Sequence, residues 1–198
     1  KEARVYNNIA ILLGKLDNDK EELRYYYKAL EKLKNDNTVY GQNLKNVVNT
    51  NIGNVYASFG EYEKSNAILE QNLYYVIKHN KINGSGLIYL RMGGNYMALK
   101  DYQTSLKYLN KAINSFRSVS NKSGEGDALR TIGDTYFHMN QLDKAEDFTL
   151  KGLQLSKQIG ELESMKFGYE ILAKIYSSKG DFKKAYENQV QYKNVSDQ

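Results

Sequence analysis

A repeat of forty residues constrains this chain more than any other feature of its sequence. A small residue recurs four times at this interval, and a tyrosine follows it three positions later each time. An earlier, imperfect copy is formed by Ile9, Ala10 and Leu13. A chain with such a period folds as an array of similar units, because each unit buries its apolar face against its neighbours. The small residues are Gly53, Gly93, Gly133 and Ala173, and the tyrosines are Tyr56, Tyr96, Tyr136 and Tyr176.

The second half of each unit keeps the same period. Six residues after each tyrosine stands an aromatic residue or a leucine, and a second small residue stands three positions after that. Glycine or asparagine in the intervening turn suits a left-handed helix end, and an acidic residue after it suits the start of another helix. No stretch alternates for long enough to indicate a strand. Each unit is therefore predicted to be two antiparallel helices. The turns contain Gly60, Lys100, Asn140 and Gly180.

This pattern resembles the tetratricopeptide repeat family. The resemblance is carried by the small residue of the first helix, the tyrosine three positions later and the small residue nine positions after that tyrosine. The chain departs from the family in having no Trp, no closing Pro and a period longer than the usual 34 residues. In its period it resembles the extended repeats of bacterial signalling proteins and of some cell-polarity scaffolds. Its last unit, from Tyr176 to Asp197, resembles the final repeat in the sensor regions of Bacteroidetes-type histidine kinases and helix-turn-helix regulators.

The resemblance implies an all-α fold, a right-handed α-α superhelix of about five helix pairs. We expect residues 1–198 to form a single array. Its repeats are expected to span approximately residues 3–45, 46–85, 86–125, 126–165 and 166–198.

The composition excludes several kinds of chemistry. The chain has no Cys, which removes disulfides, thiol catalysis and thiolate metal sites. His79 and His138 are 59 positions apart, and neither has a second histidine at metal-ligand spacing. Gly84-Ser85-Gly86 and Gly124-Glu125-Gly126 begin like nucleotide loops but lack a third glycine and a preceding strand, so both are interpreted as turns between repeats. We expect no enzymatic activity, no cofactor and no bound metal.

Charge and hydropathy argue against nucleic-acid and membrane binding by this segment. The 28 basic and 23 acidic residues give a net charge of +5, and the lysines are dispersed along the chain. A nucleic-acid-binding protein usually has a basic stripe or run. No window approaches 18 consecutive apolar residues, so no transmembrane helix is predicted.

The resemblance places the binding surface on a concave face lined by the first helix of each pair. The side chains expected there are those that the repeat does not use for packing. From the first unit to the fifth they are Arg4, Asn7, Asn8 and Ile11; Thr50, Asn51 and Asn54; Leu90, Arg91 and Gly94; Asp127, Arg130, Asp134, Phe137 and His138; and Phe167, Glu170 and Lys174.

Asparagine and arginine are prominent in the first three units of this set. An asparagine side chain carries a donor and an acceptor, so it can pair with the backbone of an extended peptide without reading its sequence. Arginine can hold a carboxylate with two parallel hydrogen bonds. We hypothesise that Asn8, Asn51, Asn54 and Arg91 contact an extended or acidic peptide; the alternative is a solvated face. Asp134 and His138, one helical turn apart, are interpreted as a surface pair and not as a catalytic dyad.

Three roles for the whole protein remain open on this evidence. The first is the sensing or partner-binding region of a larger bacterial signalling protein, which in that family lies in the periplasm. The second is a free-standing scaffold that joins two proteins. The third is a cytoplasmic peptide-pheromone receptor.

Self-association is a further expectation. A repeat array needs polar caps at its ends. The last helix is polar enough to act as a partial cap, whereas the first unit has no cap, so a homodimer through the first unit is predicted. The polar residues of the last helix are Asn188, Gln189, Gln191 and Lys193.

Overall fold

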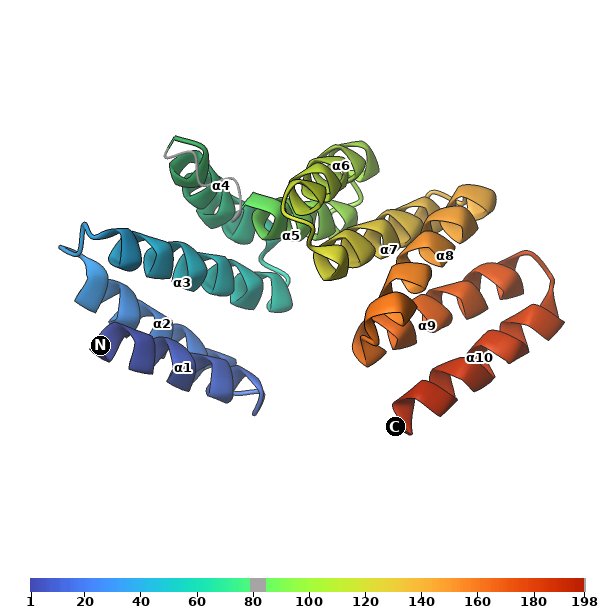
Figure 1. Ribbon diagram of the computed structural model, residues 1–198, viewed down its shortest axis with the longest axis horizontal. Coiled ribbons are helices and arrows are strands. Elements are labelled where there is room, and N and C mark those ends of the chain that lie inside the picture. Colours follow the sequence, from blue (N-terminus) through green and yellow to red (C-terminus); the bar gives the residue numbers. More distant parts are fainter. Residues whose placement is uncertain (79–84, 198) are drawn as a thin grey trace. The chain divides into compact units, whose positions relative to one another are not determined.

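The computed structural model describes residues 1–78 and 85–197, and every regular element within them is a helix (Figure 1). The chain divides into two compact units, Lys1–Gly84 and Ser85–Gln198. None of the helices in the described ranges is long and apolar enough to cross a membrane. The helices are α1 (Glu2–Gly14), α2 (Asp19–Leu33), α3 (Val39–Ser58), α4 (Tyr62–Lys78), α5 (Ser85–Ala98), α6 (Tyr102–Ser118), α7 (Lys122–His138), α8 (Leu142–Ile159), α9 (Leu162–Ser178) and α10 (Phe182–Ser196).

The first unit contains two helix pairs, α1 with α2 and α3 with α4. Helix α2 also packs on α3, and this contact joins the two pairs. Burial of apolar side chains between these helices supplies most of their stability, because isolated helices of this length are marginal in water. The core of the unit contains Ala10, Tyr26, Ala29, Val48, Ile52 and Val55.

The second unit contains three helix pairs, α5 with α6, α7 with α8 and α9 with α10 (Figure 1). Each of the first two pairs packs through its second helix on the first helix of the next pair, and the first helices α5, α7 and α9 also contact one another in that order. The expected all-α repeat of helix pairs is confirmed. Its core residues include Leu109, Ile113, Phe116, Leu129 and Ile132 between α5 and α8, and Leu153, Leu172, Tyr176 and Val195 between α8 and α10.

Three helices begin at least four residues earlier than the expected repeat boundaries at residues 46, 126 and 166, namely α3, α7 and α9. Helix α3 begins at Val39 because the Thr38 side chain accepts a hydrogen bond from the Gly41 amide at 3.0 Å. Helix α7 begins at Lys122 because the Asn121 side chain accepts one from the Gly124 amide at 2.9 Å. A side-chain cap of this kind satisfies an amide that the helix leaves unpaired, and so fixes where the helix starts.

The interpretation of Gly124-Glu125-Gly126 as a turn between repeats is wrong, because all three residues lie in α7. Glycine is needed at position 124 because a Cβ atom there would overlap the ring of Phe116. Gly86, in α5, faces the same ring, and a Cβ atom on it would lie 2.8 Å from a ring carbon. The glycines therefore let two first helices approach one aromatic side chain. Of the other predicted turn, Ser85 and Gly86 also lie in a helix, α5, and Gly84 lies outside the described residues.

The turn inside each of four helix pairs contains a residue with a left-handed backbone, as the sequence predicts. The φ angles are 74° at Gly60, 62° at Lys100, 57° at Asn140 and 78° at Gly180. The two non-glycine residues adopt a conformation that glycine enters at no steric cost. The repeat thus keeps the turn geometry even where the residue type changes.

The recurring tyrosines pack between helices. The ring of Tyr96 stacks on Tyr108 with centroids 5.4 Å apart, and that of Tyr136 lies 5.5 Å from Phe148. The Tyr176 hydroxyl donates a hydrogen bond to Glu146 at 2.6 Å, and burial raises the pKa of Tyr176 to about 12.

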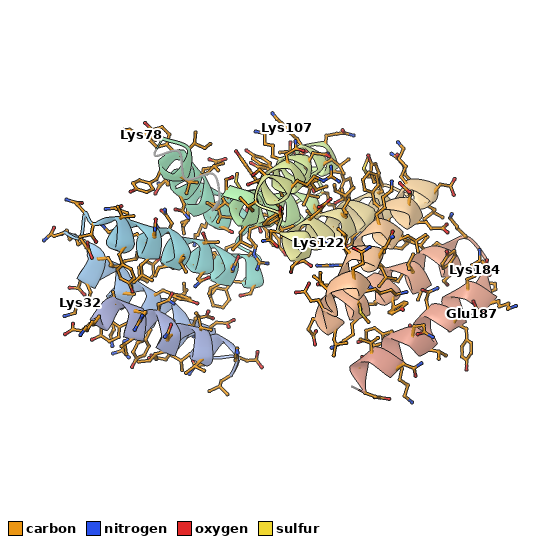
Figure 2. The ribbon with its side chains drawn as sticks, in the orientation of Figure 1. Lys32, Lys78, Lys107, Lys122, Lys184 and Glu187 are labelled. Carbon is orange, nitrogen blue, oxygen red and sulfur yellow. The ribbon has the colours of Figure 1, made fainter. Side chains whose placement is uncertain are left out.

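A lysine eight positions after three of the repeat tyrosines lies over the tyrosine ring. Lys64, Lys144 and Lys184 place their ammonium groups 5.7, 5.2 and 5.0 Å from the ring centroids of their tyrosines. Lys184 is labelled on α10 in Figure 2. Each contact adds a cation–π attraction to the packing of the pair.

Two glycines of the first helices are expected to respond in opposite ways to alanine. In Gly133→Ala the new Cβ would lie 3.0 Å from the Thr149 backbone nitrogen and 3.1 Å from the Ala145 carbonyl oxygen. Helices α7 and α8 would have to separate, so we expect a loss of about 2–3 kcal/mol in the free energy of unfolding. In Gly94→Ala the Cβ meets nothing within 4 Å, so we expect a gain of about 0.5–1 kcal/mol from helix propensity.

Chemical denaturation of both variants beside the unchanged chain measures these differences. An unfolding free energy for Gly133→Ala equal to that of the unchanged chain would contradict the close approach of α7 and α8.

Candidate functional site

The first helices of the second unit present one continuous polar surface. Because α5 contacts α7 and α7 contacts α9, side chains on their shared side lie next to one another. We call this surface the first-helix face. It consists of Arg91 and Gly94 from α5, Asp127, Arg130, Asp134 and His138 from α7, and Phe167, Glu170 and Lys174 from α9.

Arg130 lies at the centre of the first-helix face. Its guanidinium carbon is 4.8 Å from the centroid of the Phe167 ring, and one terminal nitrogen is 3.4 Å from the Asp127 carboxylate. The Asp127 carboxylate also accepts a hydrogen bond from the Ser164 hydroxyl at 2.9 Å. The Nε of Arg130 is buried and has no hydrogen-bond partner. Arg130 is thus held in place by an aromatic ring but retains unused donor capacity.

Arg91 is exposed on α5, and no carboxylate of the described residues forms an ion pair with it. Partial desolvation of the guanidinium by the surrounding protein lowers its pKa, Asp127 raises it and Arg130 lowers it. Arg91 and Arg130 therefore both lie near the Asp127 carboxylate, which is already bonded to Ser164. A guanidinium presents five donors in a planar fork, so this pair can accept an additional carboxylate.

Asp134 and His138 form the surface pair expected from their spacing. The His138 Nε2 lies 3.6 Å from the Asp134 carboxylate. The ring of Tyr102, from α6, stacks on His138 with centroids 6.4 Å apart. Burial raises the pKa of Asp134, while His138, Lys174 and Arg130 lower it. Lys174 is 2.7 Å from Glu170 one turn away.

The sequence reasoning missed Ser164 and Tyr102. Ser164 orients Asp127, and Tyr102 supports His138. The residue forty positions before Ser164 is Gly124 and the one forty after Tyr102 is Leu142. Neither contact therefore repeats through the array, and the period carried no signal for them.

In the first unit, the predicted asparagines form a short chain of hydrogen bonds. The Asn51 amide donates to Asn7 at 3.4 Å, and the Asn7 amide donates to Asn8 at 3.4 Å. The Oδ1 of Asn54 is buried and has no hydrogen-bond partner. Asn8 is exposed, and Asn51 and Asn54 are half-buried, so these three side chains stay available to a ligand.

Three of the side chains predicted to line the binding surface are buried instead. Asn7 is 5% exposed because it lies between α1 and the neighbouring α3. Thr50 is 5% exposed because it packs toward α4, where its hydroxyl accepts a hydrogen bond from Asn72 at 2.9 Å. Leu90 is 8% exposed and belongs to the apolar core. The helical face assumed for these residues was wrong by about one position.

The described residues contain no group of three or more His, Cys, Asp or Glu side chains that could hold a metal ion. His79 lies outside the described residues. The first-helix face therefore offers paired charges and aromatic rings, an arrangement suited to non-covalent binding.

Two models of the tetratricopeptide repeat match the chain, over residues 3–35 and 85–158. Together they cover just over half of its length, and the chain belongs to the tetratricopeptide repeat family. Members of this family are generally non-catalytic protein-binding modules, and this chain is a protein-interaction module. A comparison with curated proteins finds no match.

Several solved structures share the fold. A Rap protein complexed with competence and sporulation factor has 16% identity and a TM-score of 0.87, over 98% of this chain and 54% of that one. The signal transduction ATPase with numerous domains from Pyrococcus horikoshii, which carries a tetratricopeptide repeat sensor, has 20% identity and a TM-score of 0.79, over 98% of this chain and 29% of that one. BtubC from P. vanneervenii has 16% identity and a TM-score of 0.78, over 94% of this chain and 76% of that one. The chain spans about half of the Rap protein and less than a third of the ATPase.

The buried position of Thr50 generates a stability prediction. Thr50→Val keeps the size of the side chain but removes the hydroxyl that accepts from Asn72 and donates to the Asn46 carbonyl oxygen at 2.8 Å. We expect the free energy of unfolding to fall by about 1–2 kcal/mol, because the buried Asn72 amide loses a partner. Asn8→Ala, on the exposed side of α1, is expected to change it by less than about 0.5 kcal/mol.

Urea denaturation of both variants is the measurement. If Asn8→Ala were the more destabilising of the two, the assignment of Thr50 to packing and Asn8 to the surface would be wrong.

Proposed function

We propose that the first-helix face binds an extended peptide through an acidic side chain or a terminal carboxylate. The observation that carries the proposal is the pair Arg91 and Arg130: among the described residues Arg91 forms no ion pair, and Arg130 forms one ion pair, with Asp127 at 3.4 Å. An incoming carboxylate would accept hydrogen bonds from the guanidinium donors. Lys174 and His138 lie farther along the same face and provide further contacts for an extended chain.

The open position at Gly94 supports this proposal. Gly94 is one turn after Arg91 on α5, and a Cβ atom there would meet nothing within 4 Å. A peptide backbone can therefore approach α5 closely beside the charged group. Phe167, which is 48% exposed on α9, offers apolar contact on the other side of Arg130.

The asparagines of the first unit are a separate candidate for contact with a peptide backbone. Asn8, Asn51 and Asn54 can pair with peptide backbone groups irrespective of sequence. If these asparagines form only a solvated face, replacing them leaves the affinity of the chain for the peptide unchanged.

For the whole protein, the proposed role is the sensing or partner-binding region of a larger bacterial signalling protein. Two similar structures support it: a Rap protein bound to competence and sporulation factor and the tetratricopeptide repeat sensor of a signal transduction ATPase. A free-standing scaffold and a cytoplasmic peptide-pheromone receptor are the alternatives. The gene sequence on both sides of this segment distinguishes the three roles. A kinase encoded there would support the signalling protein, a DNA-binding domain the pheromone receptor, and neither of them the free-standing scaffold.

Peptide titration tests the binding site. A library of short synthetic peptides graded from acidic to basic is screened against the 198-residue chain, and the acidic peptide that binds most tightly is titrated by calorimetry. Arg91→Ala is expected to weaken this peptide about ten- to one-hundred-fold, because charge-assisted hydrogen bonds contribute roughly 1.5–3 kcal/mol. Raising the salt concentration should weaken binding to the unchanged chain more than to the variant.

The matched control is Lys107→Ala, which removes a positive charge from the exposed surface of α6 (Figure 2). It should leave the affinity unchanged. An equal loss of peptide affinity in the two variants would show that the effect comes from net charge alone. An unchanged affinity in Arg91→Ala would show that Arg91 does not contact the peptide. Asn54→Ala tests the first unit in the same titration.

A further inference from the structure

The charged side chains of the first-helix face balance one another. With His138 neutral, the face carries three basic and three acidic residues. A ligand that brought only negative charge would leave an excess of that charge in the complex, whereas a ligand with one negative and one positive group would keep the balance. The basic residues are Arg91, Arg130 and Lys174, and the acidic residues are Asp127, Asp134 and Glu170.

Four of these six charges are paired within the fold. The ammonium group of Lys174 lies 2.7 Å from the carboxylate of Glu170. The carboxylate of Asp127 lies 3.4 Å from Arg130 and also accepts a hydrogen bond from Ser164 at 2.9 Å. In both pairs, the charge of one residue is compensated by that of the other, so the charge that is left for a ligand must be sought elsewhere on the face.

Arg91 and Asp134 are the two charges that remain. Within residues 1–78 and 85–197, Arg91 forms no ion pair and the Asp134 carboxylate accepts no hydrogen bond. The Nε2 of His138 lies 3.6 Å from this carboxylate, but it is positively charged only when the imidazole is protonated. The Asp134 side chain is also only 29% exposed, so water solvates it incompletely. A partly buried carboxylate of this kind is stabilised by a cationic hydrogen-bond donor.

Open space beside α5 gives a ligand access to both groups. Gly94 lies three positions after Arg91 on α5, and it occupies the repeat position that Asp134 occupies in α7, forty residues later. A Cβ atom on Gly94 would meet nothing within 4 Å. Because α5 contacts α7, a ligand that crosses Gly94 can reach Arg91 and Asp134 at the same time.

Aromatic rings surround His138, the neighbour of Asp134. The His138 ring stacks on Tyr102 with centroids 6.4 Å apart, and it meets the Phe137 ring edge-on with centroids 5.8 Å apart. These contacts hold His138 beside the carboxylate. The faces of aromatic rings attract cations, so the surroundings of Asp134 suit an ammonium or guanidinium group better than a second anion.

We propose that Asp134 binds a basic side chain of the peptide, two positions from the acidic side chain that the proposed function assigns to Arg91. The inference rests on the proposed function, since it takes the first-helix face to be a peptide-binding surface. Side chains two positions apart in an extended chain point the same way and start about 7 Å apart. The axes of packed helices are about 8–10 Å apart, and long side chains such as those of glutamate and lysine span the difference.

A set of designed peptides tests the inference by NMR titration of the 198-residue chain. Each is a short peptide of serine and alanine with blocked ends that contains Glu-Ala-Lys, Lys-Ala-Glu, or one of these two with norleucine in place of lysine. Norleucine keeps most of the length of lysine but has no charge. We expect the better mixed peptide to bind about ten-fold more tightly than its norleucine analogue, because a charge-assisted contact is lost. Equal affinities, or no binding by any of the peptides at millimolar concentration, would overturn the inference.

Asp134→Asn identifies the residue that binds the cation. This variant keeps the shape of the side chain and removes its charge, so the preference for lysine over norleucine should disappear. The matched control is Asp147→Asn on α8, because Asp147 also lies one turn from a basic residue, with Lys151 at 2.6 Å. The control should keep the preference. An equal loss of preference in both variants would attribute it to net charge and contradict the inference.

A charge reversal gives a result that misfolding cannot imitate. Asp134→Lys should bind a peptide with Glu-Ala-Glu more tightly than either mixed peptide, which reverses the order expected for the unchanged chain. The same order in the variant and the unchanged chain would show that the peptide lysine does not contact Asp134. Circular dichroism of each variant checks that the helices are retained.

Arg91→Ala in the same titrations separates this inference from the proposed function. If this variant weakens every glutamate peptide while lysine adds nothing to the affinity of the unchanged chain, the acidic site stands and the inference fails. If the preference for lysine depends on Asp134 but Arg91→Ala changes no affinity, Asp134 stands as the cation site and the role proposed for Arg91 fails.

Discussion

The close approach of the two helices in each pair is the constraint on which this fold depends. A Cβ atom at Gly133 would lie only 3.0–3.1 Å from backbone atoms of α8. Cβ atoms at Gly53 and Gly93 would lie 3.0 and 2.6 Å from the side chains of Leu69 and Leu109. A small residue at this position sets the separation of the helices, and the separation sets where the tyrosine three residues later can pack. Protein interiors are packed too densely to absorb an extra methyl group at such a contact without movement. The small residues recur every forty positions because the two helices of each of these pairs pack at the same short distance.

The sequence predicted the helix pairs and their turns well, because the same packing requirement recurs four times and so stands out from local variation. It failed where one residue acts alone. Thr38 and Asn121 start α3 and α7 early through single side-chain caps, and Gly124 is a contact glycine that resembles a turn glycine in sequence. For the binding surface, a shift of one residue along a helix rotates a side chain by about 100°, which is enough to bury Thr50 and Leu90. Contacts between helices, such as Ser164 with Asp127, leave no trace in the spacing at all.

The first-helix face carries hydrogen-bond donors that the fold does not fully pair. On the first-helix face, the donors of Arg91 and Arg130 exceed the acceptors that the fold itself supplies, which suits a charged ligand. Tetratricopeptide repeats can bind diverse partners for this reason: the framework is constant, and small departures from it create the sites.

Among the described residues, the lysines that lie over aromatic rings all belong to second helices. They are Lys28, Lys64, Lys78, Lys111, Lys144, Lys151, Lys157 and Lys184. An ammonium group drawn toward a ring is a less mobile counter-charge than one on a free side chain. The positive charges of the second helices are therefore dispersed and partly engaged with aromatic rings. In the proposed binding mode, an acidic peptide instead contacts the two guanidinium groups of the first-helix face. With a net charge of only +5, the protein would then bind such a peptide without binding polyanions in general.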